Sequence, residues 1–235
     1  MFPESSIEIP AGVLYESDAD SVNLIDAANA KSLTFSWSYP GEIRVEKIYT
    51  FNPDKYSFDL EIRLTNLSSN TIKENAFIAW NRYVDPSEKG DRYNHEGPIS
   101  FVGNKVISKK IKKLGEREFE GPDVSWGGFE TKYFISAIIP EQPSLTNFIT
   151  SKDSKNIVST ALEGPKNLIP PDQSGSFRYS VYLGPKKYDN LKAQNVNLEN
   201  SIDFGSWIKW LALPLLTALN WIHKYVLNYG VAIII

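Results

Sequence analysis

Cysteine is absent from this chain of 235 residues, and histidine occurs only as His95 and His223. The first absence excludes a disulfide framework and a thiolate metal site. With two histidines, the chain has no His-Glu-x-x-His motif, and it lacks the glycine-lysine loop that binds phosphates. A Ser-His-Asp arrangement stays open, but no local nucleophile signature supports it. The residues therefore name no catalytic residue, no cofactor-binding residue and no metal ligand.

A basic excess is also missing, since 25 lysines and arginines are set against 28 aspartates and glutamates. A nucleic-acid-binding protein normally shows a basic face, so we expect no nucleic-acid partner. The first ten residues, MFPESSIEIP, have neither a basic n-region nor an apolar h-region, and no signal peptide is visible. If the domain is exported, we expect the exporting segment to lie upstream or to have been removed.

Strand patterns make up most of the chain. Residues 32–39 alternate between large apolar side chains and small hydroxyl side chains, which predicts a half-buried strand. Residues 42–51 and 56–64 predict two more strands, and the Asn-Pro-Asp-Lys sequence between them predicts a turn. These two strands should form an antiparallel hairpin.

Residues 72–84 predict one further strand, and a turn is expected at Gly127-Gly128. The strand after this turn, which ends near Pro140, is apolar on both faces and should be central in a sheet. Shorter strand patterns cover 144–150, 156–162 and 176–183, and 187–198 resembles a short helix. Together the patterns favour a mainly β protein, a large antiparallel β-sandwich followed by C-terminal α-helices.

The basic run from Lys109 to Lys113 has two interpretations. Lysines on a solvated edge strand discourage edge-to-edge pairing, which is the simpler interpretation. The alternative is a contact with lipid headgroups or with another protein.

The terminal stretch, residues 202–235, is aromatic and carries little charge. If 202–228 form a helix, its polar residues lie along one narrow stripe, and most of its circumference is apolar. Pro214 should kink this helix. A bilayer span needs about 20 mostly apolar residues, but the clean run between Lys209 and Asn220 is much shorter. An amphipathic helix lying in the membrane interface fits better.

The expected membrane-interface residues are aromatic or apolar side chains together with lysines that reach toward phosphates. They are Trp207, Lys209, Trp210, Leu211, Pro214, Leu215, Trp221, Lys224 and Tyr225. Residues 229–235 end in a wholly apolar run, which predicts the start of a transmembrane helix truncated by the chain end. The alternative for 202–228 is an ordinary C-terminal helix that packs on a soluble core.

Several stretches, taken in order, resemble the YidC family of membrane-protein insertases. They are the hairpin VEKIYTFNPDKYSFDLEIRLTN, the strand segment WGGFETKYFISAIIP, the segment YLGPKKYDNLKA, and the terminal run that begins with IDFG and continues through LNWIHKYVLNYG. The resemblance covers most of the chain from about Ile43 onward and is densest at the C-terminal end.

The resemblance implies a periplasmic domain over residues 1–198, a β-sandwich of the supersandwich, mutarotase-like kind that ends in a short helix. It places an interfacial helix at 202–228 and the start of a second transmembrane helix at 229–235. It also implies an inner-membrane protein that catalyses no covalent reaction and needs no cofactor. Its partners would be the lipid bilayer, nascent membrane proteins and Sec translocon components. The family's cavity arginine would fall after Ile235.

Two other functions stay open. One is a carbohydrate-binding or mutarotase-like sandwich anchored to a membrane, which would need a histidine–carboxylate pair in an open groove. Because His95 is the single histidine of the sandwich, the sequence argues against this pair. The other is an adhesion-like sandwich with a C-terminal anchor.

Overall fold

The computed structural model describes residues 12–25, 27–85, 87 and 95–203, and then 214–215, 218–219, 221–222, 225–226 and 230–231. Contacts divide the chain into two compact units, Met1–Glu199 and Asn200–Ile235. Among the described residues, no helix is both long enough and apolar enough to cross a membrane.

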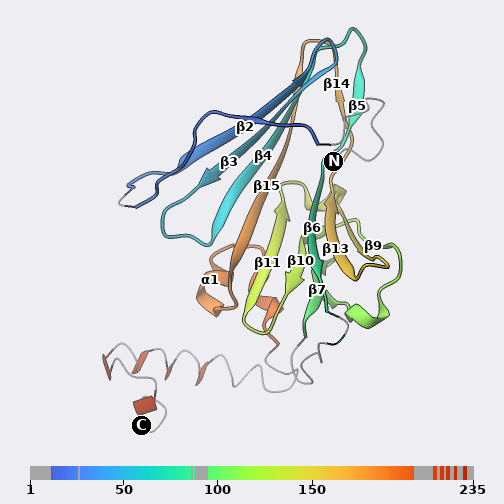
Figure 1. Cartoon of the computed structure of the whole chain (residues 1–235). Coiled ribbons are helices and arrows are strands. Elements are labelled where there is room, and N and C mark those ends of the chain that lie inside the picture. Colours follow the sequence, from blue (N-terminus) through green and yellow to red (C-terminus); the bar gives the residue numbers. More distant parts are fainter. Residues whose placement is uncertain are drawn as a thin grey trace. The chain divides into compact units, whose positions relative to one another are not determined.

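Most strands of the first unit belong to one large antiparallel sheet (Figure 1). In spatial order its strands are β1 (Glu16–Ser17), β2 (Lys31–Tyr39), β3 (Ile43–Phe51), β4 (Ser57–Asn66), β15 (Ser174–Pro185), β11 (Phe134–Pro140), β10 (Val124–Glu130), β7 (Gly97–Val102) and β8 (Lys105–Ser108). The predicted hairpin is confirmed, because Phe51 is paired with Phe58 and Ile43 with Asn66. The doubly apolar strand, β11, is central as expected, between β15 and β10.

The other described strands of this unit form a smaller sheet and a two-stranded sheet. The smaller sheet contains β6 (Phe77–Tyr83), β13 (Ile157–Glu163), β12 (Asn147–Lys152) and β9 (Glu118–Glu120), and the pair is β14 (Asn167–Ile169) with β5 (Ile72–Glu74). The short helices are η1 (Ile111–Lys113), η2 (Pro143–Leu145), α1 (Tyr188–Lys192) and η3 (Leu198–Ser201). The prediction of a mainly β antiparallel sandwich is therefore confirmed.

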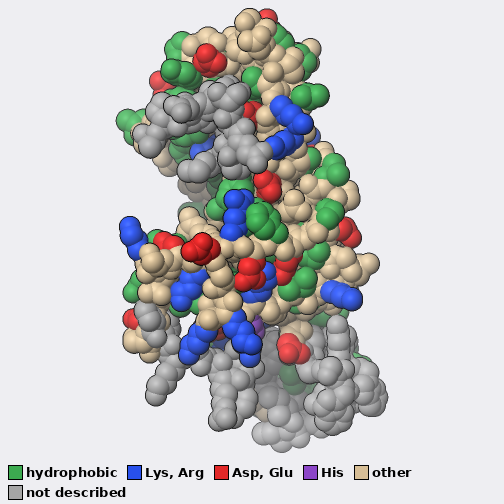
Figure 2. Space-filling view, turned by 90° about the vertical axis from the view of Figure 1, so that its right-hand side faces the viewer, with side chains coloured by type: hydrophobic (Ala, Val, Ile, Leu, Met, Phe, Trp, Pro, Cys, Tyr) green, Lys and Arg blue, Asp and Glu red, His purple; other side chains and the backbone are tan. Residues whose placement is uncertain are grey.

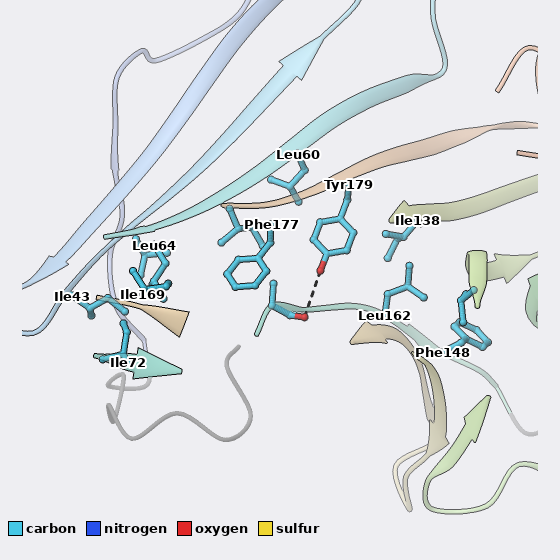
Figure 3. Close-up of a cluster of buried hydrophobic side chains, with 14 residues drawn as sticks. Ile43, Leu60, Leu64, Ile72, Ile138, Phe148, Leu162, Ile169, Phe177 and Tyr179 are labelled. Atoms are coloured by element: carbon cyan, nitrogen blue, oxygen red, sulfur yellow. Dashed lines mark hydrogen bonds between the residues drawn. The ribbon is translucent and has the colours of Figure 1, made fainter. Parts of the chain in front are cut away.

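The core lies between the large sheet and the two smaller sheets (Figure 3). Ile43 and Leu64 of the large sheet gather with Ile72 and Ile169 of the small pair, and Phe148 and Leu162 come from the four-stranded sheet. Each fully buried side chain of this size contributes roughly 1.5–3 kcal/mol. Tyr179 lies in this cluster, its hydroxyl donates to the Ala76 carbonyl at 3.5 Å, and burial raises the pKa of that hydroxyl.

The expected turn at Gly127-Gly128 is wrong, because β10 runs through both glycines and the chain reverses after Glu130. A Cβ at Gly127 would overlap the ring of Phe148, which comes from the facing sheet. A Cβ at Gly128 would overlap the Ser136 carbonyl of the neighbouring strand. Glycine is needed at these positions for close approach, not for a turn.

The single strand expected over 72–84 is also wrong, since it is divided between two sheets. The division falls at Asn75 and Ala76, which are both buried. The Ala76 carbonyl accepts a hydrogen bond from the Gly164 amide at 3.1 Å, which holds the crossing chain in place.

The basic run does not form an edge strand, because β8 ends at Ser108 and η1 occupies Ile111–Lys113. Lys109 is turned toward two carboxylates, with its Nζ 2.8 Å from Glu118 and 3.0 Å from Glu120. Burial would lower the pKa of Lys109, but these two carboxylates outweigh it and raise the pKa.

Candidate functional site

The described part of the second unit presents an apolar helical face. Pro214, Ala218, Trp221 and Tyr225 are helical, exposed and spaced by four, three and four residues. This spacing places them on one side of a helix. Trp221 is 62% exposed and Tyr225 is 73% exposed, and their ring centroids are 5.1 Å apart in an edge-on arrangement.

A second row runs beside the first, with Leu215 58% exposed and Leu219, Ile222 and Val226 half-buried. Large exposed apolar side chains are unfavourable in water by roughly 25 cal/mol for each Å². Trp and Tyr are also the residues that membrane–water interfaces favour, since each has an apolar ring and a polar group. This face has the chemistry of a surface that contacts lipid.

Four of the nine expected interface residues lie on or beside this face. They are Pro214, Leu215, Trp221 and Tyr225. The remaining five, Trp207, Lys209, Trp210, Leu211 and Lys224, lie outside the described residues. Of the expected transmembrane start at 229–235, only Gly230 and Val231 are described, and both are helical.

Within the sandwich, a buried carboxylate connects three distant parts of the chain. Glu130 is 2% exposed. Its Oε1 lies 2.8 Å from His95 Nδ1, and its Oε2 accepts a hydrogen bond from Lys186 Nζ at 2.6 Å. The second ring nitrogen of His95 lies 3.1 Å from the Lys109 carbonyl. Sequence reasoning missed this cluster, because its members are 35 and 56 residues apart.

The cluster corrects one expectation, since a histidine–carboxylate pair does exist in the sandwich. Both carboxylate oxygens of Glu130 are already bound, and the His95 side chain is 23% exposed. A small purple area of histidine is visible on the face shown in Figure 2. A general base must lie within hydrogen-bond reach of the proton that it removes, but both ring nitrogens of His95 already have partners within the sandwich. The pair therefore ties the segment before β7 to β10 and, through Lys186, to the end of β15.

The outer face of β3, β4 and β15 carries a chain of alternating charges. Arg63 lies 3.1 Å from Glu61 and 3.7 Å from Glu46, and Arg178 lies 3.4 Å from Glu61. Arg178 also reaches Glu141, at 3.5 Å. Burial would raise the pKa of Glu61, but the Ser176 hydroxyl and the neighbouring guanidinium groups outweigh it and hold the pKa below its ordinary value.

A shallow cavity of about 330 Å³ lies over part of this charged row. Its lining is Ile48, Thr50, Asp59, Leu60, Glu61, Ile139, Pro140, Glu141, Arg178, Tyr179 and Ser180. Arg178 is already tied to two of the acidic residues. Among the described residues, no group of three or more His, Asp or Glu side chains is arranged to hold a metal ion.

Comparison of this chain with known proteins finds one family over nearly its whole length. The family model of the YidC periplasmic domain matches residues 3–218. The chain is 53% identical over 234 residues to the Membrane protein insertase YidC of Syntrophus aciditrophicus, covering 100% of this chain and 43% of the relative. It is 33% identical to that of Geobacter metallireducens, covering 98% of this chain and 43% of the relative. The chain thus spans less than half the length of these curated relatives.

Solved structures with a similar sandwich share little sequence with this chain. The galactosidase domain of an alpha-galactosidase-sucrose kinase has a TM-score of 0.54 at 13% identity, over 77% of this chain and 28% of that chain. The GH36 alpha-galactosidase AgaB of Geobacillus stearothermophilus has a TM-score of 0.54 at 9% identity, over 69% and 25%. A galactose mutarotase related enzyme of Lactobacillus acidophilus has a TM-score of 0.46 at 9% identity, over 72% and 71%.

The likeness to the two galactosidases shows the sandwich fold alone, because a fold hosts many functions. The sequence relatives are decisive, since the periplasmic-domain pattern extends over almost the whole chain and the identity to one relative exceeds half. The chain belongs to the YidC family of membrane protein insertases, and its sandwich is the periplasmic domain of that family.

Proposed function

We propose that this chain is the periplasmic portion of an inner-membrane insertase that assists the insertion and folding of nascent membrane proteins. Its relatives carry the name membrane protein insertase, and the chain corresponds to 43% of their length. Insertion requires no covalent chemistry, because a segment entering a bilayer mainly needs its polar groups to lose water at lower cost. The sandwich would then support the insertase at the membrane surface.

The observation that carries this proposal is the exposed apolar face formed by Leu215, Trp221 and Tyr225. We assign residues 202–228 to an amphipathic helix lying in the membrane interface and residues 229–235 to the start of a transmembrane helix. The lipid contacts would come from the nine predicted interface residues, with Lys209 and Lys224 reaching toward phosphates.

The proposed partners are the bilayer, nascent membrane proteins and Sec translocon components. No nucleic-acid partner is proposed, because the net charge is −3. The sugar chemistry of the galactosidases stays with those proteins, because the likeness is one of fold.

Vesicle co-sedimentation tests the membrane face. In the full chain, Trp221→Ser combined with Tyr225→Ser should weaken binding to phosphatidylglycerol-containing vesicles at least about tenfold, since two large apolar surfaces leave the lipid. The matched control is Tyr83→Ser with Leu168→Ser, which removes side chains that are 64% and 69% exposed on the sandwich. Equal binding by wild type and the first variant would show that this face is not the lipid contact.

A further inference from the structure

One end of the sandwich carries four exposed apolar side chains. Tyr56 follows the β3–β4 turn and is 52% exposed. Tyr133 and Phe134, at the β10–β11 connection, are 65% and 59% exposed, and Leu183 near the end of β15 is 37% exposed. We call these four residues the aromatic end.

Backbone hydrogen bonds hold the aromatic end together. The Leu183 amide donates to the Tyr56 carbonyl at 2.8 Å, and the Lys186 amide donates to the Tyr133 carbonyl at 2.7 Å. Phe134 is paired with Pro185 across the ladder between β11 and β15. Three segments that are distant in sequence are therefore brought to the same end of the large sheet. The ion pair between Lys186 and Glu130, at 2.6 Å, fixes the strand ends beside it.

Lysines accompany these rings. Lys55, Lys132, Lys187 and Lys192 are exposed in the same segments, where the exposed acidic residues are Asp54 and Asp189. The Nζ of Lys132 lies 5.3 Å from the Tyr133 ring centroid, within range of a cation–π contact. Aromatic rings combined with an excess of lysine are typical of surfaces that meet lipid headgroups.

The chain leaves the sandwich from this end. Helix α1 directly follows β15 and lies at the same end as the β10–β11 connection, whereas β5 and β14 form the opposite end (Figure 1). Residues after α1 lead on to the second unit, where Trp221 and Tyr225 are exposed.

We propose that the aromatic end rests on an anionic bilayer and holds the sandwich with β5 and β14 directed away from the membrane. This proposal rests on the proposed function, since it requires a bilayer at the C-terminal side of the sandwich. A bilayer suits the patch better than a partner protein does. A stable protein interface buries about 800 Å² on each side, from roughly 20–30 residues, whereas this end offers four exposed apolar side chains beside four exposed lysines.

The absence of cysteine makes the orientation measurable, because one introduced cysteine gives a single label site. Tyr133→Cys in the full chain would carry a nitroxide at the aromatic end. Leu168→Cys on β14 provides the matched control, since Leu168 is 69% exposed at the opposite end. With phosphatidylglycerol-containing vesicles, the label at 133 should become more accessible to oxygen and less accessible to a water-soluble nickel chelate. The label at 168 should not change.

A second measurement uses affinity. Tyr133→Ser with Phe134→Ser should weaken vesicle binding about threefold to tenfold, and Leu168→Ser should leave it unchanged. Circular dichroism confirms that each variant is folded.

The outcomes separate the two proposals. If the chain sediments with vesicles but the label at 133 stays in water, the orientation is wrong and the proposed helical contact stands. If the chain does not sediment at all, the helical contact fails and the orientation fails with it. Immobilisation of the label at 133 without vesicles, rising with protein concentration, would assign the patch to a second copy and overturn the proposal.

Discussion

At the scale of single residues, Glu130 is a buried carboxylate whose replacement should strongly destabilise the sandwich. Its side chain is 3% exposed, and it is the shared partner of His95 and Lys186. Removing one member of a buried ion pair is costly, because the remaining charge stays buried without compensation.

We therefore expect Glu130→Gln to lower the free energy of unfolding by about 3 kcal/mol, as measured by urea denaturation at neutral pH. Glu118→Gln is the matched control. Glu118 also pairs with a lysine, at 2.8 Å, but its side chain is 38% exposed. This control should cost about 0.5 kcal/mol. A similar small loss in both variants would contradict the structural role assigned to Glu130.

Single residues also show where sequence reasoning fails. The pair Gly127-Gly128 predicts a turn when only the sequence is considered. The actual reason for the glycines is tertiary, since the Phe148 ring and the Ser136 carbonyl leave no room for a side chain. His95 seemed to lack a carboxylate partner because Glu130 is distant in sequence. Both errors concern tertiary contacts, which local pattern does not encode.

At the scale of elements, the charged row across β3, β4 and β15 joins three strands on their outer face. The lowered pKa of Glu61 means that the folded state binds this proton less tightly than the unfolded chain does. The stabilisation is therefore complete above the ordinary carboxyl pKa of about 4.3. It is lost as the pH falls through the lowered value.

Glu61→Gln should lower the free energy of unfolding at neutral pH by about 0.5–1 kcal/mol, because solvent screens a row that is partly exposed. The difference from wild type should disappear in acid, below the lowered pKa, where the native carboxyl is protonated too. Chemical denaturation at several pH values measures this. Glu141→Gln, at the more exposed end of the row, should have a smaller effect. A difference that persists in acid would mean that packing, not charge, explains the loss.

Most elements are predictable because alternation of period two is a local property. The hairpin of β3 and β4 follows from it, and the central position of β11 follows from another local pattern, a strand that is apolar on both faces. The division of 72–84 between two sheets does not, since Asn75 and Ala76 break the strand through contacts with distant residues such as Gly164. Of the candidate site, the apolar helical face follows from helical spacing, whereas the aromatic end requires the sheet to bring its turns together.

At the scale of the whole molecule, the two units should respond differently to lipid. Short helices are marginal in water, and most of their stability comes from burying an apolar face. The described helical residues of Asn200–Ile235 expose such a face, whereas the sandwich has its own core.

Addition of phosphatidylglycerol-containing vesicles should therefore increase the helical signal in far-UV circular dichroism. The thermal midpoint of the sandwich should shift by less than about 2 °C, which corresponds to a change below roughly 1 kcal/mol. Trp221→Ser with Tyr225→Ser should reduce the gain in helix. A large shift of the midpoint with no gain in helix would mean that lipid acts on the sandwich instead.

The long strand β15 has a mechanical consequence. It is the last strand before the chain leaves the sandwich, and it is paired with β4 from Ser174 to Tyr182 and with β11 from Tyr179 to Pro185. Ladder hydrogen bonds lie perpendicular to the strands, so a pull on the C-terminal side acts along β15 and loads many of these bonds in shear at once. A tether at this point would transmit force into the sheet without opening it bond by bond.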